Sequence, residues 1–210
     1  MSYVITRLMG GLGNQLFQYA TGSTLASRLG VPHLLDRTFL DQRGPNVTWT
    51  PRELELDVLQ APLEFATADQ VHRARRELDV RWYRLLHRAL PFIRSLCMVE
   101  RDRLYDPRLA ERTAPVYLDG YWQNERYFAS RAHDLRNRLF VPRDRPSEHN
   151  TAVLARIRST VSASLHIRRG DYVSLESASA YHGICTLEYY SSSARHLAEH
   201  VGVERFFIFS

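Results

Sequence analysis

The first 36 residues hold the pattern that most restricts how this chain can fold. A short apolar run over residues 3–9 precedes a glycine-rich stretch at 10–14, and residues 15–29 repeat apolar side chains at helical spacing. Gly30 stands where a helix C-cap is expected, and residues 31–36 (VPHLLD) have the character of a second strand. Strand, glycine turn, helix and strand in this order predict the first βαβ unit of a doubly wound parallel sheet.

The rest of the chain continues with alternating helical and extended patterns. Helices are predicted over residues 52–96, 122–140, 151–159 and 187–200, and strands at 98–99, 116–120, 161–167 and 206–209. A polar stretch at 142–150 carries two prolines and reads as a linker, so we expect domains at residues 1–145 and 146–210. Because the chain stops within an apolar strand, whose edge would be unsupported, we expect the second domain to be incomplete.

Composition excludes several classes of protein. The 210 residues are 44% hydrophobic and 24% charged, which suits a packed globular core and not a disordered chain. The sequence has no Lys, so all 28 basic residues are Arg, and the formal net charge is +5. Basic charge by itself is compatible with nucleic acid, an anionic membrane face or an anionic small substrate, but no nucleic-acid motif supports the first. Cys97 and Cys185 are too far apart to indicate a disulfide framework or a zinc site.

The sequence also constrains where the protein acts. The N-terminus is too short and interrupted for a signal peptide, and no window reaches the roughly 20 apolar residues of a membrane span. Residues 73–88 form a basic amphipathic stretch, which fits either a solvated helix or a helix that docks on an anionic partner. We therefore expect a cytoplasmic protein with at most peripheral contact at the cytoplasmic face of a membrane.

Residues 10–15 (GGLGNQ) form the first candidate site. Glycines after a first strand let the backbone approach a ligand closely, and the helix N-terminus behind them presents N–H groups to an anion. Asn14 and Gln15 add side-chain donors. The spacing matches neither the dinucleotide-binding fingerprint nor the P-loop. From these residues alone, a structural turn and a ligand-binding turn are equally open.

Residues 166–172 (HIRRGDY) form the second candidate, at the end of a predicted strand. In open α/β sheets the carboxyl ends of strands line the ligand crevice, and alternation along the strand places His166 and Arg168 on one side. One Arg directed into the crevice can bind a diphosphate bidentately, and Asp171 is expected to orient the second Arg. The alternative is a surface turn with an Arg–Asp pair worth less than about 1 kcal/mol.

Residues 120–128 (GYWQNERYF) form the third candidate. Aromatic rings beside amides and a carboxylate suit a sugar, whose faces stack on rings and whose hydroxyls form hydrogen bonds. An aromatic seam of the hydrophobic core is the equally weighted alternative.

These segments together resemble the α-1,2-fucosyltransferases, glycosyltransferase family 11. The similar segments are residues 10–20 (GGLGNQLFQYA), 120–123 (GYWQ), 166–172 (HIRRGDY), 182–185 (HGIC) and 206–210 (FFIFS). The resemblance covers essentially the whole chain in order. Since the family's last segment normally continues into paired aspartates and further nucleotide-binding domain, the resemblance implies that the C-terminal part is lacking.

The resemblance implies an α/β fold of the GT-B type, with two Rossmann-like domains, a cleft between them and an incomplete second domain. Residues 1–145 would be the acceptor side with the glycine loop, and residues 146–210 the start of the GDP-fucose-binding domain. The implied activity is inverting and independent of metals and cofactors. It moves L-fucose from GDP-fucose to the 2-hydroxyl of a terminal galactose of an oligosaccharide. The alternative is a catalytically incompetent fragment that only binds a sugar nucleotide.

The resemblance also implies roles for residues. Arg168 is expected to hold the diphosphate, with Asn14 near the same phosphate, and the catalytic candidates are Arg168, Asp171 and His166. The general base is open among Asp171, Glu188 and His166. Arg168 and helix N–H groups can stabilise the charge that develops on the leaving phosphate without a metal. The expected substrate-binding residues are Gly11, Gly13, Asn14, Gln15, Trp122, Gln123, Arg169 and Tyr172.

Overall fold

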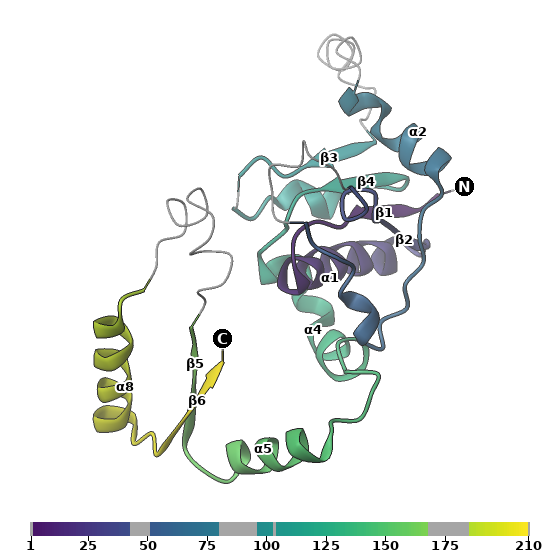
Figure 1. The fold of residues 1–210 in the computed structure, drawn as a ribbon. Coiled ribbons are helices and arrows are strands. Elements are labelled where there is room, and N and C mark those ends of the chain that lie inside the picture. The colour runs from purple at the N-terminus through teal and green to yellow at the C-terminus, as the bar shows by residue number, and fades with distance from the viewer. Residues whose placement is uncertain (1, 43–50, 80–95, 103, 168–184, 210) are drawn as a thin grey trace. The chain divides into compact units, whose positions relative to one another are not determined.

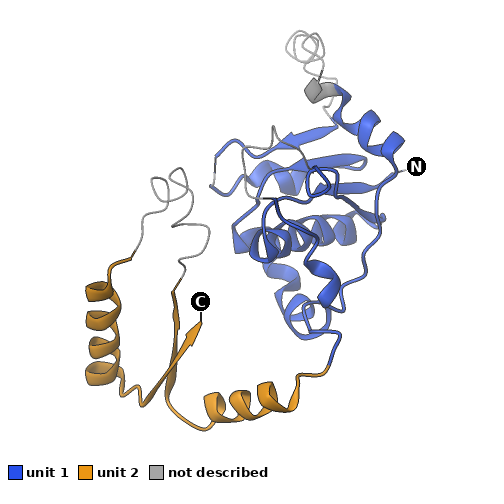
Figure 2. Ribbon diagram, in the orientation of Figure 1, with its two compact units in different colours: residues 1–144 blue, residues 145–210 orange. Residues whose placement is uncertain are grey.

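The computed structural model describes residues 2–42, 51–79, 96–102, 104–167 and 185–209. The chain forms two compact units, Met1–Asp144 and Arg145–Ser210 (Figure 2). The division lies one residue before the domain boundary expected from the sequence. The assignment of the two parts to acceptor and donor stays a prediction.

The first unit is built on a four-stranded parallel sheet with the strand order β2-β1-β4-β3 (Figure 1). The strands are β1 (Val4–Arg7), β2 (His33–Asp36), β3 (Cys97–Val99) and β4 (Val116–Asp119). The predicted strand–helix–strand order at the N-terminus is confirmed, and so is the mixed α/β class with a parallel sheet. The carboxyl ends of β1, β2 and β4 meet at one edge, since Arg7 pairs with Asp36 and Thr6 with Leu118 in parallel register.

Helices cover both faces of this sheet. Helix α1 (Leu12–Leu29) packs on one face, where Val4 joins its apolar residues in a core cluster. Helix α2 (Ala68–Asp79) packs on the other face, where its side chains contact Ile5 and Tyr117. Successive strand residues point to opposite faces of a sheet, so this split follows directly from the alternation of the strands.

The middle of α1 is buried on all sides, whereas the sequence predicted a single buried face. Every residue from Gln18 to Ala26 is buried. Gly22 permits this close approach, because a Cβ at that position would overlap Thr6 Oγ1 and His33 Nε2. The helix ends as predicted at Gly30, whose φ of 65° is left-handed and whose N–H caps the last turn.

Two predicted helical regions of the first unit are confirmed only in part, since α2 lies within the predicted 52–96 and short helical segments lie within the predicted 122–140. Within the described part of residues 52–67 the only helical element is the 3₁₀ turn η1 (Leu56–Val58), and residues 80–95 of the predicted helix lie outside the described residues. Within the predicted helix at 122–140, residues 125–127 form one 3₁₀ turn and residues 129–139 form a continuous run of 3₁₀, α and π geometry. Phe128, with φ −133° and ψ 15°, separates the two segments, and the Asn124 side chain caps the first. The short elements of this unit are η2 (Pro107–Glu111), η3 (Glu125–Tyr127), η4 (Ala129–Arg131), α4 (Ala132–Asp134) and η5 (Leu135–Leu139).

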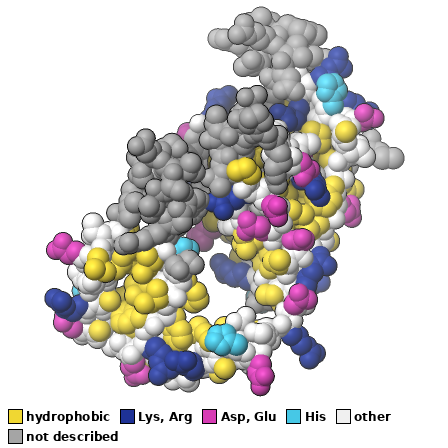
Figure 3. Space-filling view, viewed as in Figure 1, with side chains coloured by type: hydrophobic (Ala, Val, Ile, Leu, Met, Phe, Trp, Pro, Cys, Tyr) yellow, Lys and Arg dark blue, Asp and Glu magenta, His cyan; other side chains and the backbone are white. Residues whose placement is uncertain are grey.

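The second unit is small and has little buried core. Its elements are α5 (Glu148–Arg158), β5 (Ser162–His166), α8 (Leu187–Val201) and β6 (Arg205–Phe209), and β5 and β6 pair in parallel. Of its described residues only Val203 is buried, and Ile208 remains 65% exposed. Figure 3 accordingly shows hydrophobic side chains on the surface of this unit. The start of α5, capped by Ser147, lies inside the stretch predicted as a linker.

Across the described ranges of both units, no helix combines the length and the apolarity needed to cross a membrane.

Candidate functional site

An ion pair connects the carboxyl ends of two strands of the first unit. Arg7, at the end of β1, donates through Nη1 to both carboxylate oxygens of Asp119, at the end of β4, over 3.1 and 3.0 Å. Both side chains are mostly buried, and the Arg7 guanidinium lies 5.1 Å from the ring centroid of Phe39. The positive charge at this edge is therefore neutralised within the chain. No local pattern in the sequence predicts this pair, although each member is the last residue of a strand.

A second carboxylate at the same edge is buried. Asp36 accepts a hydrogen bond of 2.6 Å from the Tyr117 hydroxyl and one of 2.9 Å from the Thr38 N–H. Burial, together with the neighbouring Asp36 carboxylate, raises the pKa of Tyr117, so its hydroxyl stays protonated and donates. Asp36 is thus a buried, hydrogen-bonded carboxylate at the carboxyl end of β2.

The glycine loop brings two predicted ligand residues into contact. Gly10 has a φ of 73°, and a Cβ there would overlap the Asn14 side chain, so glycine allows the amide of Asn14 to lie over the loop. Asn14 Oδ1 accepts a hydrogen bond of 2.6 Å from Gln123 Nε2, across 109 positions of sequence. Gly13 is exposed in the first turn of α1.

Gln15 lies behind this loop and supports it. Its side chain is 0% exposed, and Nε2 donates to the carbonyls of Gly10 and Glu53 over 2.9 and 2.8 Å. Its Oε1 accepts from the Glu55 N–H at 3.0 Å. The side-chain amide of Gln15 therefore bonds only to backbone groups and holds the glycine loop in place. Because this side chain is fully buried, it cannot make the direct contact with a ligand that the sequence had led us to expect.

Trp122 belongs to the hydrophobic core. Its side chain is 0% exposed, and its ring packs edge-to-face on Tyr127 with centroids 5.6 Å apart. The core-seam alternative therefore describes Trp122, and a buried ring cannot provide the stacking face for a sugar.

The turn that contains Trp122 is anchored by Glu100, which follows β3. Glu100 accepts hydrogen bonds from the N–H groups of Tyr121 at 2.7 Å and Trp122 at 3.1 Å. Gly120 leaves room for this carboxylate, because a Cβ there would collide with the Glu100 side chain. This anchoring places the next residue, Gln123, where it reaches Asn14.

A further carboxylate, Glu55, stands at the N-terminus of α1. Its Oε2 accepts a hydrogen bond of 3.1 Å from the Leu12 N–H, and its Oε1 would lie 3.8 Å from a Cβ placed on Gly11. The sequence predicted that these helix N–H groups would be available to an anion. One of them is instead bonded to a carboxylate of the chain, from a residue 43 positions away.

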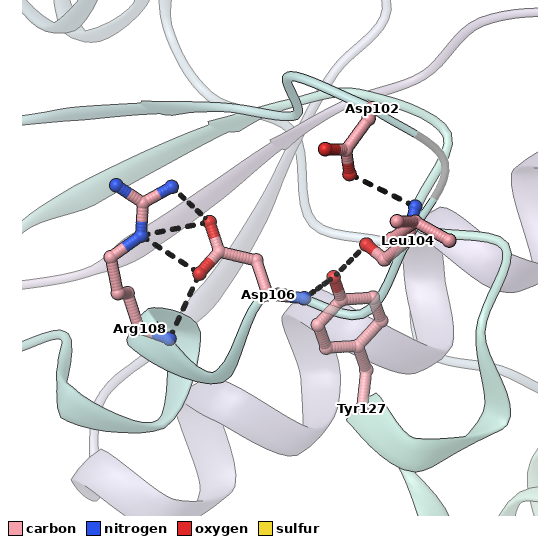
Figure 4. A network of polar contacts seen from close by, with 5 residues as sticks. All are labelled: Asp102, Leu104, Asp106, Arg108 and Tyr127. Carbon is pink, nitrogen blue, oxygen red and sulfur yellow. Dashed lines mark hydrogen bonds and ion pairs between the residues drawn. The ribbon is translucent and has the colours of Figure 1, made fainter.

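A hollow of about 410 Å³ with several charged residues in its lining lies beside the end of β3. Asp106 pairs bidentately with Arg108, and the Tyr127 hydroxyl accepts from the Asp106 N–H at 2.7 Å and donates to the Leu104 carbonyl (Figure 4). The hydrogen bond from Arg108 lowers the pKa of the Asp106 carboxyl. Asp102 accepts from the Leu104 N–H, so these groups stabilise the wall of the hollow.

The other predicted site residues fall in the second unit. Arg168, Arg169, Asp171 and Tyr172 lie outside the described residues. His166 is the exposed last residue of β5, and its carbonyl accepts from the Tyr190 hydroxyl at 3.3 Å. Glu188 is exposed in the first turn of α8. In the part of the chain that is described, no three His, Cys, Asp or Glu side chains gather as a metal site would require.

The chain is similar to one protein family and to two curated proteins. The family model described as Glycosyl transferase family 11 matches residues 106–210. The chain is 33% identical over 214 residues to an alpha-1,2-colitosyltransferase of Escherichia coli, covering 100% of this chain and 69% of that protein. It is 24% identical over 219 residues to the O-antigen biosynthesis glycosyltransferase WbnK of Escherichia coli, covering 97% of this chain and 70% of that protein. No solved structure matches significantly.

Proposed function

Because this chain belongs to glycosyl transferase family 11, we propose that it transfers L-fucose from GDP-fucose to the 2-hydroxyl of a terminal galactose. The observation that carries the proposal is the 33% identity, along the whole chain, to an enzyme whose name specifies an α-1,2 transfer. The family membership agrees with the resemblance of the five motif segments. The GT-B organisation is part of the proposal.

In the proposed reaction Arg168 binds the diphosphate of the donor. When the bond between the anomeric carbon and the phosphate oxygen breaks, negative charge develops on the β-phosphate, and a bidentate guanidinium stabilises it. Arg168 lies outside the described residues, so this role rests on its place two residues after the end of β5 and on the family motif.

The glycine loop of the first unit supports the binding of a sugar. Asn14 and Gln123 present amide groups side by side, and both kinds of atom in an amide can pair with hydroxyls. The hydrogen bond of 2.6 Å from Gln123 to Asn14 holds the two side chains in place. Preorganised polar groups of this kind reduce the entropy lost on binding.

The name of the relative favours a second candidate donor. An alpha-1,2-colitosyltransferase at 33% identity indicates that colitose could replace fucose as the transferred sugar. The two candidates share the reaction and the linkage, and differ in the sugar that the donor site accepts.

The test is a transfer assay on the purified 210-residue chain. GDP-fucose and GDP-colitose are supplied in parallel with a β-galactoside, GDP release is measured, and the linkage of the product is read by NMR. We expect transfer to the 2-hydroxyl from one donor, and a loss of about 100-fold in kcat in Arg168→Ala. Arg195→Ala is the matched control, since Arg195 is an exposed arginine of α8 in the same unit.

Three outcomes would change the proposal. Full activity in Arg168→Ala would refute the role of this residue. GDP binding without transfer from either donor would favour the alternative of a sugar-nucleotide-binding fragment. A chain that neither binds GDP nor transfers a sugar would refute the proposed function.

A further inference from the structure

The N-terminus of α1 already has a negative partner. The Leu12 N–H donates to Glu55 Oε2 at 3.1 Å, so the Glu55 carboxylate stands where an anionic ligand would bind to a helix N-terminus. A phosphate that approached Gly11 would face the like charge of this carboxylate. The glycine loop therefore differs from loops that bind phosphates.

The strand ends beside the loop do not supply a free positive charge. Arg7 is bound by both oxygens of Asp119 and lies against Phe39. Among the described groups at this edge, the Arg37 guanidinium after β2 is likewise paired with Asp41, and the carboxylates of Asp36 and Glu55 have no arginine partner. Such a balance disfavours a diphosphate and suits a neutral group that donates hydrogen bonds, such as a sugar hydroxyl.

One oxygen of Glu55 is available for such a group. Oε1 has no hydrogen bond to any residue that the structure describes, and it lies beside Gly11, where the absence of a side chain leaves the approach open. On the other side of the loop, the Asn14 amide lies over Gly10 and pairs with Gln123. A free carboxylate oxygen and two amides thus gather around two adjacent glycines.

The position of this carboxylate is held by the loop itself. The Glu55 N–H donates to the buried side chain of Gln15 at 3.0 Å, and Gln15 also bonds to the carbonyl of Gly10. With Oε2 held by Leu12, the orientation of Oε1 is set before a ligand arrives. A general base needs this fixed geometry toward the proton that it removes.

From this arrangement we propose that Glu55 binds the acceptor hydroxyl through Oε1 and takes its proton, an inference that rests on the proposed sugar transfer. The acceptor oxygen forms a bond to the anomeric carbon, the bond from that carbon to the diphosphate breaks with its electron pair going to GDP, and the hydroxyl proton passes to Glu55. In an inverting reaction the acceptor enters opposite the leaving diphosphate. A loop that repels phosphate and binds hydroxyls fits the acceptor side.

The decisive variant is Glu55→Gln, which keeps the shape and a hydrogen-bond acceptor for Leu12 but cannot take a proton. We expect kcat to fall by about 100-fold or more, the acidic limb of the pH–rate profile to disappear, and the dissociation constant for GDP to stay within about threefold. Glu55→Asp should recover part of the rate together with the pH limb. Asp57→Asn, an exposed carboxylate of η1 in the same segment, is the matched control and should behave like the wild type.

A second readout does not need activity. Binding of methyl β-galactoside is measured by NMR on the wild type, Glu55→Gln and Glu55→Ala, with the thermal midpoint as a check on folding. We expect binding to weaken about tenfold in Glu55→Ala, in line with the loss of a hydrogen bond to a charged group. Equal galactoside binding in all three proteins, or an unchanged pH profile in Glu55→Gln, would overturn the role of Glu55. Absence of nucleotide binding in the wild type would instead refute the proposed function.

Discussion

The contact between α1 and the sheet makes a sharp prediction for Gly22→Ala. In an exposed helix this change stabilises by about 1 kcal/mol, because alanine has the higher helix propensity. At Gly22 the new methyl group would overlap Thr6 Oγ1 and His33 Nε2, which are themselves in contact at 3.0 Å. Thr6 is fully buried on a central strand, so it has little room to move.

The magnitude follows from three contributions. Overpacking a close-packed interior costs about 1–3 kcal/mol. Disruption of the Thr6–His33 contact adds about 1 kcal/mol, and the gain in helix propensity offsets about 1 kcal/mol. We therefore expect Gly22→Ala to lower the free energy of unfolding by about 1–3 kcal/mol.

The assay is urea denaturation followed by circular dichroism, with Gly13→Ala as the matched control. Gly13 lies in the same helix, and a Cβ there would meet nothing within 4 Å. Its replacement should leave the urea midpoint unchanged or raise it. The double variant Thr6→Ala/Gly22→Ala should lose less than the sum of its single changes, because Thr6 is the closest obstacle. Equal stability of Gly22→Ala and Gly13→Ala would refute the described approach of α1 to the sheet.

Three further predictions concern polar groups that are buried or partly buried. Burial lowers the pKa of His33 from 6.5 to about 3, so the unfolded chain takes up this proton first as the pH falls. The contribution of neutral His33 to the free energy of unfolding should be complete above about pH 6.5, and the free energy of unfolding should fall by about 2 kcal/mol between pH 7 and 5. In urea titrations at each pH, His33→Gln should lack this dependence on pH. Tyr117→Phe removes the hydroxyl that donates to buried Asp36 and should cost about 1.5–3 kcal/mol in the same assay, and a cost near zero would contradict the described bond. Glu100→Gln removes the charge from two hydrogen bonds to the turn after β4 and should cost about 1–2 kcal/mol, whereas an unchanged midpoint would show that the carboxylate does not anchor that turn.

Local patterns explain which elements could be predicted. The order β1, α1 and β2 follows from apolar periodicity with Gly30 as the helix stop, and α8 begins at the predicted residue, Leu187. The predicted helix at 122–140 is only partly confirmed, although its apolar spacing is similar, because the helical segments begin at Glu125 and break at Phe128. The turn at Trp122, with a φ of 55°, and the interruption at Phe128 depend on how these rings pack in the core, which a periodicity cannot express.

In the candidate site, too, some residues could be predicted from local sequence and others could not. The glycines and the amide of Asn14 could be proposed from the sequence, because their residue types follow directly after a strand. The burial of Gln15 could not be proposed, since its hydrogen bonds reach Glu53 and Glu55, far along the chain. Glu55 itself carries no local signal, and it enters the site only because residues 53–55 lie against the glycine loop.

By itself, the sequence determined the opening βαβ unit, the membership in glycosyl transferase family 11 and the residue types available for binding sugars and phosphates. Only the tertiary structure decided which of these groups remain free. Arg7 is neutralised by Asp119, Trp122 is enclosed by the core, and the N-terminus of α1 is bonded to Glu55. The physical reason is that a polar group can bind a ligand only through donors or acceptors that other residues of the chain do not already occupy. The residues that occupy them here are distant in sequence, so the sequence pattern alone does not reveal them.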